Sequence, residues 1–151
     1  MDWATIVTAV VAIYGAVLST YALLSKRREK QRQVKVSLSM GLMALPSGEC
    51  PAVVLIEASN PGDRAVTLTN PGILLPNRST VVWPRPQSHV QFPYDLPEGK
   101  RCTAWTEAGG LAQLLTEHGF SGKIKLVGVS KDALGTAYKS RPLRFDMDGS
   151  Y

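Results

Sequence analysis

Few side chains in this sequence are of the types that carry out catalysis or bind metals. The chain has two histidines, His89 and His118, and two cysteines, Cys50 and Cys102. None of them belongs to a CxxC, HxxxH or HExxH pattern, the short spacings with which neighbouring side chains surround one zinc ion. Only the tertiary fold would bring Cys102 and His118 together as a nucleophile and its base. We therefore expect no metal site and no cofactor.

Motifs for phosphate binding, acyl transfer and calcium binding are incomplete. Gly109 and Gly110 lie close together but lack the GK[ST] or GxGxxG spacing of a phosphate-binding loop. No GxSxG sequence holds a nucleophilic serine at a strand-to-helix turn. Asp146 and Asp148 in FDMDGSY resemble a fragment of a calcium loop without its remaining ligands. The sequence therefore predicts a protein that is not an enzyme and whose function is binding.

An apolar segment opens the chain. Trp3 to Leu24 contains no charged residue and, as a helix rising ~1.5 Å per residue, covers roughly 30 Å. We expect residues 1–25 to form a transmembrane helix. A cleavable signal peptide would carry its positive charge before the apolar segment, whereas here the cations follow it. A buried core helix is the third interpretation.

A run of cations follows in a basic juxtamembrane linker, residues 26–35. By the positive-inside rule it predicts a single-pass protein with its N-terminus outside and its C-terminal domain in the cytoplasm. With Glu29 the linker accounts for the whole formal net charge of +5, so the remainder of the chain is close to neutral and indicates no nucleic-acid surface. The cations expected to set topology and contact lipid headgroups are Lys26, Arg27, Arg28, Lys30, Arg32 and Lys35.

Small residues recur along one stripe of the apolar segment. Such a stripe lets two helix backbones approach closely, which predicts self-association through this helix. The alternative is that Ala, Gly and Thr are simply common in membrane helices. The residues proposed for helix packing are Ala4, Thr8, Ala12, Gly15, Ala16, Ser19 and Thr20.

The remainder, residues 36–151, has the pattern of short strands separated by turns. Apolar residues alternate from Val34 to Leu42, and a β-branched run over residues 52–60 ends in NPGDRA. One helix is expected over residues 106–119, with Thr106 as its N-terminal cap and Gly119 closing it. GKIKLVGVS and GTAYKSRPLRF, joined by KDAL, look like a closing hairpin. The residues predict a mainly β domain, either a sandwich or a barrel, with one inserted helix.

The longest irregular piece runs from Pro84 to Gly99 and contains four prolines. It is either a passive crossover or a contact site for a partner or ligand through His89, Phe92 or Tyr94. Cys50 and Cys102 would form one disulfide if the domain were exported, but the predicted cytoplasmic topology favours two reduced thiols.

Two stretches carry a resemblance to a group of known proteins. NPGDRAVTLTNPGILLP looks like the group's turn followed by a strand, and VSKDALGTAYKSRPLRF looks like its terminal hairpin. With the apolar segment and the basic linker, they resemble small bacterial single-pass membrane proteins with a cytosolic immunoglobulin-like β-sandwich. The resemblance implies an N-terminal transmembrane α-helix in the bacterial inner membrane, followed by such a sandwich with one short inserted helix.

Two functions follow as hypotheses. The first is a non-enzymatic, membrane-tethered interaction module whose cytosolic β domain binds a protein partner at the inner membrane. The alternative, suggested by a similar layout, is a ligand-triggered, oligomerising membrane effector of a bacterial antiphage system whose β domain senses a nucleotide second messenger. The expected partners are the lipid bilayer, a second copy bound through the helix, and an unidentified cytosolic protein or small ligand. No nucleic-acid polymer is expected.

Overall fold

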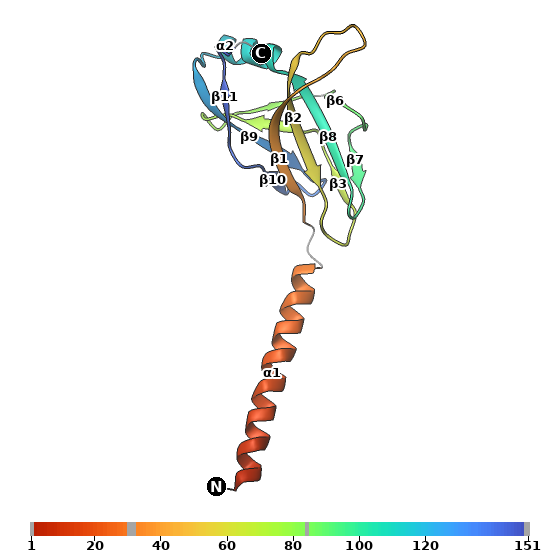
Figure 1. Ribbon diagram of the computed structural model, residues 1–151, viewed down its shortest axis with the longest axis vertical. Helices are drawn as coiled ribbons and strands as arrows, with labels where there is room; N and C mark the ends of the chain where they lie inside the picture. Colours follow the sequence, from red (N-terminus) through yellow and green to blue (C-terminus); the bar gives the residue numbers. More distant parts are fainter. Residues whose placement is uncertain (1, 30–32, 84, 150–151) are drawn as a thin grey trace. The chain divides into compact units, whose positions relative to one another are not determined.

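The computed structural model describes residues 2–29, 33–83 and 85–149 (Figure 1), leaving out the side chains of residues 5, 6, 9 and 25–29. The chain divides into two compact units, Met1–Gln31 and Arg32–Tyr151. The first unit contains one helix, and the second contains the strands and a short helix. The second unit is mainly β, as predicted.

Helix α1, Trp3–Glu29, is 27 residues long. It contains no proline, and the alanine, leucine, lysine and arginine residues in it favour the helical conformation. Its described apolar side chains, including Val11, Ile13 and Leu23, are exposed. The helix continues beyond Leu24 into the region predicted as linker, so the basic residues Lys26, Arg27 and Arg28 belong to it.

The prediction of a transmembrane helix is contradicted. Among the described residues, no helix is long and apolar enough to cross a membrane. The described residues of α1 that lower its mean hydropathy include Tyr14, Gly15, Ser19, Thr20 and Tyr21.

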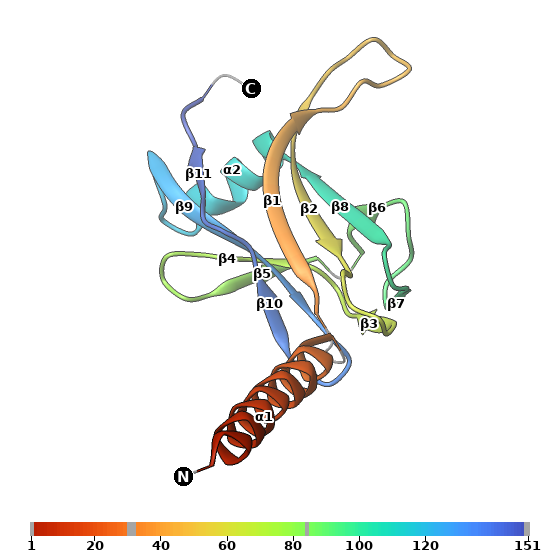
Figure 2. The same ribbon diagram turned by 60° about the horizontal axis from the view of Figure 1, so that its bottom comes forward.

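The first sheet has four antiparallel strands in the order β1-β2-β8-β6. The alternation expected from residue 34 to residue 42 is present, with Val34 buried and Lys35 exposed, but Leu42 at the far end is 74% exposed. β1 and β2 form a hairpin whose loop, residues 43–51, extends from the body (Figure 2). The strands are β1 Lys35–Leu42, β2 Ala52–Ser59, β6 Gln87–Ser88 and β8 Arg101–Glu107.

The second sheet is built around β9. Its order is β10-β9-β4-β5, and β11 also pairs with β9. A separate two-stranded sheet joins β3 to β7. The strands of these sheets are β3 Val66–Leu68, β4 Gly72–Leu74, β5 Thr80–Val82, β7 Tyr94–Leu96, β9 Lys123–Lys131, β10 Ala137–Lys139 and β11 Leu143–Asp146.

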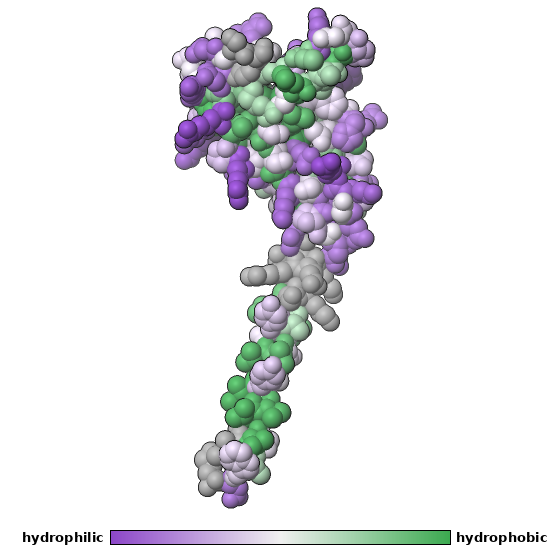
Figure 3. Space-filling model, in the orientation of Figure 1, coloured by the Kyte–Doolittle hydropathy of each residue, from purple (hydrophilic) through white to green (hydrophobic). Residues whose placement is uncertain are grey.

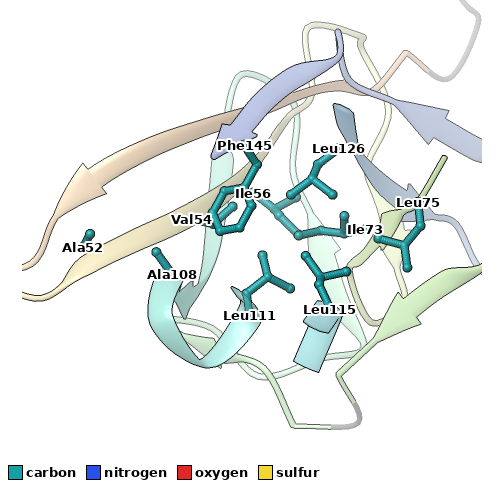
Figure 4. Packing of buried hydrophobic residues seen from close by; sticks show 10 residues of the cluster. All are labelled: Ala52, Val54, Ile56, Ile73, Leu75, Ala108, Leu111, Leu115, Leu126 and Phe145. Atoms are coloured by element: carbon teal, nitrogen blue, oxygen red, sulfur yellow. The ribbon is translucent and has the colours of Figure 1, made fainter. Parts of the chain in front are cut away.

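The core lies where the two larger sheets and the short helix meet (Figure 4). The side chains of Phe145 from β11, Leu126 from β9 and Val54 from β2 point toward one another and are fully buried. β9 approaches β1 at Gly128, where an added Cβ atom would lie 3.4 Å from Leu38, in ordinary van der Waals contact. A second buried cluster, which includes Val66, Leu68, Leu96 and Cys102, extends the core toward β3 and β7.

Helix α2, Ala108–Glu117, covers one end of this core with Leu111 and Leu115. The predicted cap Thr106 is wrong, because β8 continues to Glu107, which occupies the N-cap position without a side-chain hydrogen bond. The predicted closure at Gly119 is confirmed. Its φ of 83° is the left-handed conformation that ends many helices, and the amide of Phe120 donates to the carbonyl of Leu115 at 3.0 Å.

Asn60 of the first NPG sequence holds the turn after β2. It is 1% exposed, and its Nδ2 donates to the carbonyl oxygens of Arg64 and Leu96 at 2.7 Å and 3.0 Å. Its Oδ1 accepts a hydrogen bond from the amide of Gly62 at 3.0 Å. The side-chain amide is thus satisfied on both sides, which gives Asn60 a structural role.

The stretch from Pro84 to Gly99 is less irregular than expected. It contains β6, which pairs with β8, and β7, which pairs with β3. Both cysteines are free, with Cys50 exposed in the β1–β2 loop and Cys102 buried in β8. Burial raises the pKa of the Cys102 thiol to about 11, so this side chain is neutral and acts as an apolar core residue.

Candidate functional site

The outer face of the second sheet carries a group of exposed cations. Along β9, Leu126 and Ser130 point inward and are buried, while Lys123, Lys125 and Lys131 point to the opposite face and are exposed. The neighbouring strands β10 and β11 present further cations on the same side. Figure 3 shows hydrophilic side chains projecting from this side of the β unit. We define the basic face as Lys123, Lys125, Lys131, Lys139 and Arg144.

Two of these cations lie directly opposite each other. Lys125 of β9 pairs in register with Arg144 of β11. Like charges at directly opposite positions destabilise a sheet. Lys123 forms an ion pair of 3.5 Å with Asp146, and among the described residues no other member of the basic face forms an ion pair. The face is therefore set up to gain from binding an anionic group.

A one-residue bulge places β10 and β11 on this face together. Lys139 pairs with Val129 and Leu143 pairs with Leu126, so the outer strand uses one more residue than β9 between these points. Ser140 holds the bulge, because its amide donates to the carbonyl of Gly128 and its Oγ accepts from the amide of Gly128, both at 2.8 Å. The extra residue puts Lys139 and Arg144 on the same face, although five positions separate them in the sequence. As a result, Arg144 points outward and Phe145 points into the core.

A cavity of about 370 Å³ lies on the same outer face. Val129 is part of its apolar wall, and the absence of a side chain at Gly72 allows β4 to lie close to β5. The amide and hydroxyl of Thr69 both donate to the carbonyl of Lys131, at 2.8 Å and 3.1 Å, and so fix this end of β9 at the rim. No carboxylate lines the cavity, whose wall is formed by Thr69, Asn70, Gly72, Thr80, Val82, Pro93, Val129 and Lys131.

Asp132 follows the basic face at the β9–β10 turn but is not free to bind a ligand. Its Oδ1 accepts hydrogen bonds from the amides of Leu134 and Thr136, and its Oδ2 accepts one from the hydroxyl of Tyr138. Burial favours a raised pKa, yet these hydrogen bonds together hold the pKa of Asp132 below its ordinary value. The carboxylate is therefore ionised and serves to shape the turn.

The predicted contact loop is divided between packing and exposure. Phe92 and Tyr94 are half-buried and pack against the second core cluster. His89 is exposed and lines a separate surface cavity with Arg85 and Phe92. His89 and Phe92 therefore share a cavity, and Tyr94 is not part of its lining.

The other titratable residues stay apart. His118 is exposed at the end of α2, with its Nδ1 2.8 Å from the carbonyl oxygen of Leu114. Cys102 lies in β8, and Cys50 lies in the β1–β2 loop. No group of three or more His, Cys, Asp or Glu side chains that would hold a metal ion is found among the described residues.

The small-residue stripe lies on α1, and all its members are exposed. The hydroxyls of Thr8 and Thr20 donate to the carbonyls of Ala4 and Ala16, each at 2.8 Å, so neither hydroxyl needs a second helix as its partner. Of the linker cations, only Lys35 has a described side chain. It is exposed at the start of β1, whereas Lys30 and Arg32 lie outside the described residues, as do the side chains of Lys26, Arg27 and Arg28.

The basic face was not predicted from the sequence. The signal available was the alternation of Lys123 and Lys125 with Ile124 and Leu126, which placed two cations on one side of a strand. The near-neutral charge of the domain concealed this local concentration. The contribution of Arg144 depended on the bulge, which no local pattern revealed.

Comparisons with known proteins identify no family. No family model matches the chain, and no curated protein matches it. One similar solved structure is the X-ray structure of Northeast Structural Genomics Consortium target SoR45, with a TM-score of 0.37 and 13% sequence identity, covering 78% of this chain and 89% of that chain. A similarity at this level carries no argument about fold or function.

Proposed function

We propose that the β unit is a non-enzymatic interaction module that binds an acidic segment of a protein partner on the basic face. The observation that carries the proposal is the directly opposed pair Lys125 and Arg144, with no ion-pair partner among the described residues. A carboxylate placed between the two cations would relieve their repulsion and gain charge-assisted hydrogen bonds. Localisation at a membrane stays a prediction.

The cavity supports a protein rather than a nucleic acid as the partner. Its apolar wall of Val82, Pro93 and Val129 suits one apolar side chain, while the neighbouring cations suit acidic residues on either side. An apolar anchor surrounded by charged contacts is a common arrangement in protein interfaces. Proteins that bind single-stranded nucleic acids use aromatic side chains to stack bases, and the described residues of this face include no aromatic side chain.

Binding of a defined peptide to the full chain tests the proposal. The probe is a fluorescent peptide with one central leucine between aspartate and glutamate residues, measured by anisotropy at low and physiological salt. We expect salt-dependent binding that Lys125→Glu with Arg144→Glu weakens at least tenfold. The control is Arg64→Glu with Lys100→Glu, which changes the net charge equally on exposed side chains outside the basic face and should weaken binding by less than about threefold.

Three results would contradict the proposal. The first is a folded wild-type chain that does not bind the peptide at low salt. The second is an equal loss of affinity in the two double variants, which would indicate a response to net charge alone. The third is tighter binding of a single-stranded oligonucleotide or an anionic lipid vesicle than of the peptide.

A second candidate function is recognition of a nucleotide second messenger. The observation that favours it is the presence of Lys131, Asn70 and Thr80 around a cavity without carboxylates, which is a suitable setting for a small anion. Titration with a cyclic dinucleotide tests it. Saturable binding that is lost in Lys131→Ala, with peptide binding retained, would favour this function, and absence of binding would remove it.

A further inference from the structure

β1 is an edge strand whose outer side forms no strand pair among the described residues, although β9 and β10 of the second sheet approach it. It pairs with β2 through all eight of its residues, and it lies at the end of the order β1-β2-β8-β6. Among the described residues, no backbone hydrogen bond joins β1 to any strand other than β2. Half of its amide and carbonyl groups therefore point away from the sheet, because these groups alternate in direction along a strand.

The features that normally prevent an edge strand from pairing are missing from β1. Its register with β2 runs without interruption from Lys35 opposite Ser59 to Leu42 opposite Ala52, so it has no bulge. It contains no proline, and Lys35 at its beginning is its only charged residue. Long, regular edges of this kind are templates for a further strand.

The far half of β1 also exposes apolar side chains. Met40 is 36% exposed and Leu42 is 74% exposed, although they lie on the same side of the strand as the half-buried Val36 and Leu38. This side is covered by the second sheet only along the first half of the strand, as the contact of Leu38 with Gly128 shows. A partner strand would have to cover the apolar residues as well as the backbone.

We propose that β1 pairs antiparallel with β1 of a second copy of this chain, with Leu38 opposite its own counterpart. In this register Val36 faces Met40 and Ser37 faces Ser39, each from the other copy. Lys35 faces Gly41, so no like charges meet. The apolar side chains of both copies lie on one side of the joined sheet, and the polar ones lie on the other.

Self-pairing follows from the symmetry of this sequence. A two-fold interface requires that residue i contact residue j and that j contact i, so an antiparallel strand must match its own reverse. β1 does so around Leu38, with apolar residues two positions away on either side and serines one position away. A shift by one residue would put apolar side chains opposite polar ones, so the alternation excludes it. Centring on Ser37 or Ser39 would keep the alternation, and the cysteine pairs below distinguish these registers from the one proposed.

Disulfide formation between engineered cysteines tests the register in the full chain. The background is Cys50→Ser, since Cys50 is the exposed native thiol and Cys102 is buried. Ser37→Cys and Ser39→Cys are prepared separately and mixed under mild oxidation. Residues directly opposite have Cβ atoms about 4.5–5.5 Å apart, which is close to disulfide geometry. We expect the mixed disulfide to form at least fivefold faster than either symmetrical one.

A second measurement separates pairing through β1 from association through the exposed helix α1. In sedimentation equilibrium, Met40→Lys with Leu42→Lys should weaken the dimer at least tenfold. Leu134→Lys is the matched control, because Leu134 is also 74% exposed but lies in the β9–β10 turn, and it should leave the dimer unchanged. A dimer that survives the double substitution, or folded variants that give no preferential mixed disulfide, would overturn the proposal.

Discussion

Two outer edges of the β unit, β1 from the beginning of its sequence and β10–β11 from the end, are built differently (Figure 2). β1 is regular, uncharged beyond Lys35 and free of proline. β10–β11 contains the bulge at Ser140, a proline at position 142, and cations on both of its strands. Bulges, prolines and charges discourage pairing with another chain.

This difference assigns the two edges different tasks. The interrupted edge resists pairing and presents Lys139 and Arg144 beside the lysines of β9. The regular edge retains the backbone groups and apolar side chains that a second strand needs. We therefore expect binding of an acidic partner at the first edge and pairing of two copies at the second.

Losing Phe145 from the interrupted edge should have the largest effect. Phe145 of β11 is fully buried, whereas its neighbour Arg144 is exposed. In Phe145→Ala we expect the free energy of unfolding to fall by about 3–5 kcal/mol, the usual effect of losing a buried phenylalanine from a core. Urea denaturation measures this. Arg144→Ala should change stability by less than about 0.5 kcal/mol; equal losses in the two variants would contradict the directions that the bulge gives these side chains.

Substitutions of two glycines should have intermediate effects on stability. Gly72 lies in an inner strand of the second sheet, and Gly41 lies in the edge strand β1 of the first sheet. In Gly72→Ala the new Cβ would lie 2.8 Å from the carbonyl oxygen of Val81, so strand β4 must move, and we expect a loss of about 1–3 kcal/mol. In Gly41→Ala it would lie 2.9 Å from Cδ1 of Leu55, a side-chain end that is able to rotate away. Thermal denaturation should therefore show a loss below about 1 kcal/mol for Gly41→Ala, and the reverse order would contradict this account.

The smallest effect concerns the turn that leads into the interrupted edge. The pKa of Asp132 is lower in the folded chain than its ordinary value of 3.8, so its contribution to stability is present above pH 3.8 and is lost as the pH falls through the folded-state pKa. Asp132→Asn should cost about 1 kcal/mol at pH 7, because charged hydrogen bonds become neutral ones. Urea denaturation at several pH values checks this, and a difference that grows toward acid pH would be the contrary result.

The sequence predicted the elements that have a strong pattern of their own. The alternation from Val34, the β-branched run ending before Asn60, and the closing turn at Gly119 all correspond to observed features. β6 and β7 were missed because strands of two or three residues have too few positions to show a period. The transmembrane prediction relied on the length of the uncharged segment Trp3 to Leu24, but among the described residues no helix is long and apolar enough to cross a membrane.

The candidate site was harder to predict because it depends on tertiary pairing. If residues 135–145 formed one uninterrupted strand, Lys139 and Arg144 would lie on opposite faces, and only the bulge brings them together. Phe92 and Tyr94 were proposed as contacts because aromatic residues in a proline-rich loop attract attention. Both pack against the second core cluster, which contains Leu96 and Cys102, and their role as contacts stays a prediction.

The most direct test of the central claim is to map the binding of the acidic peptide by amide chemical shifts in the full, isotope-labelled chain at constant protein concentration. The account predicts saturable shifts at Lys125, Lys139 and Arg144 and around the cavity, with the amides of β1 unchanged. Shifts concentrated along β1, or peptide binding that leaves Lys125 and Arg144 unaffected, would contradict it.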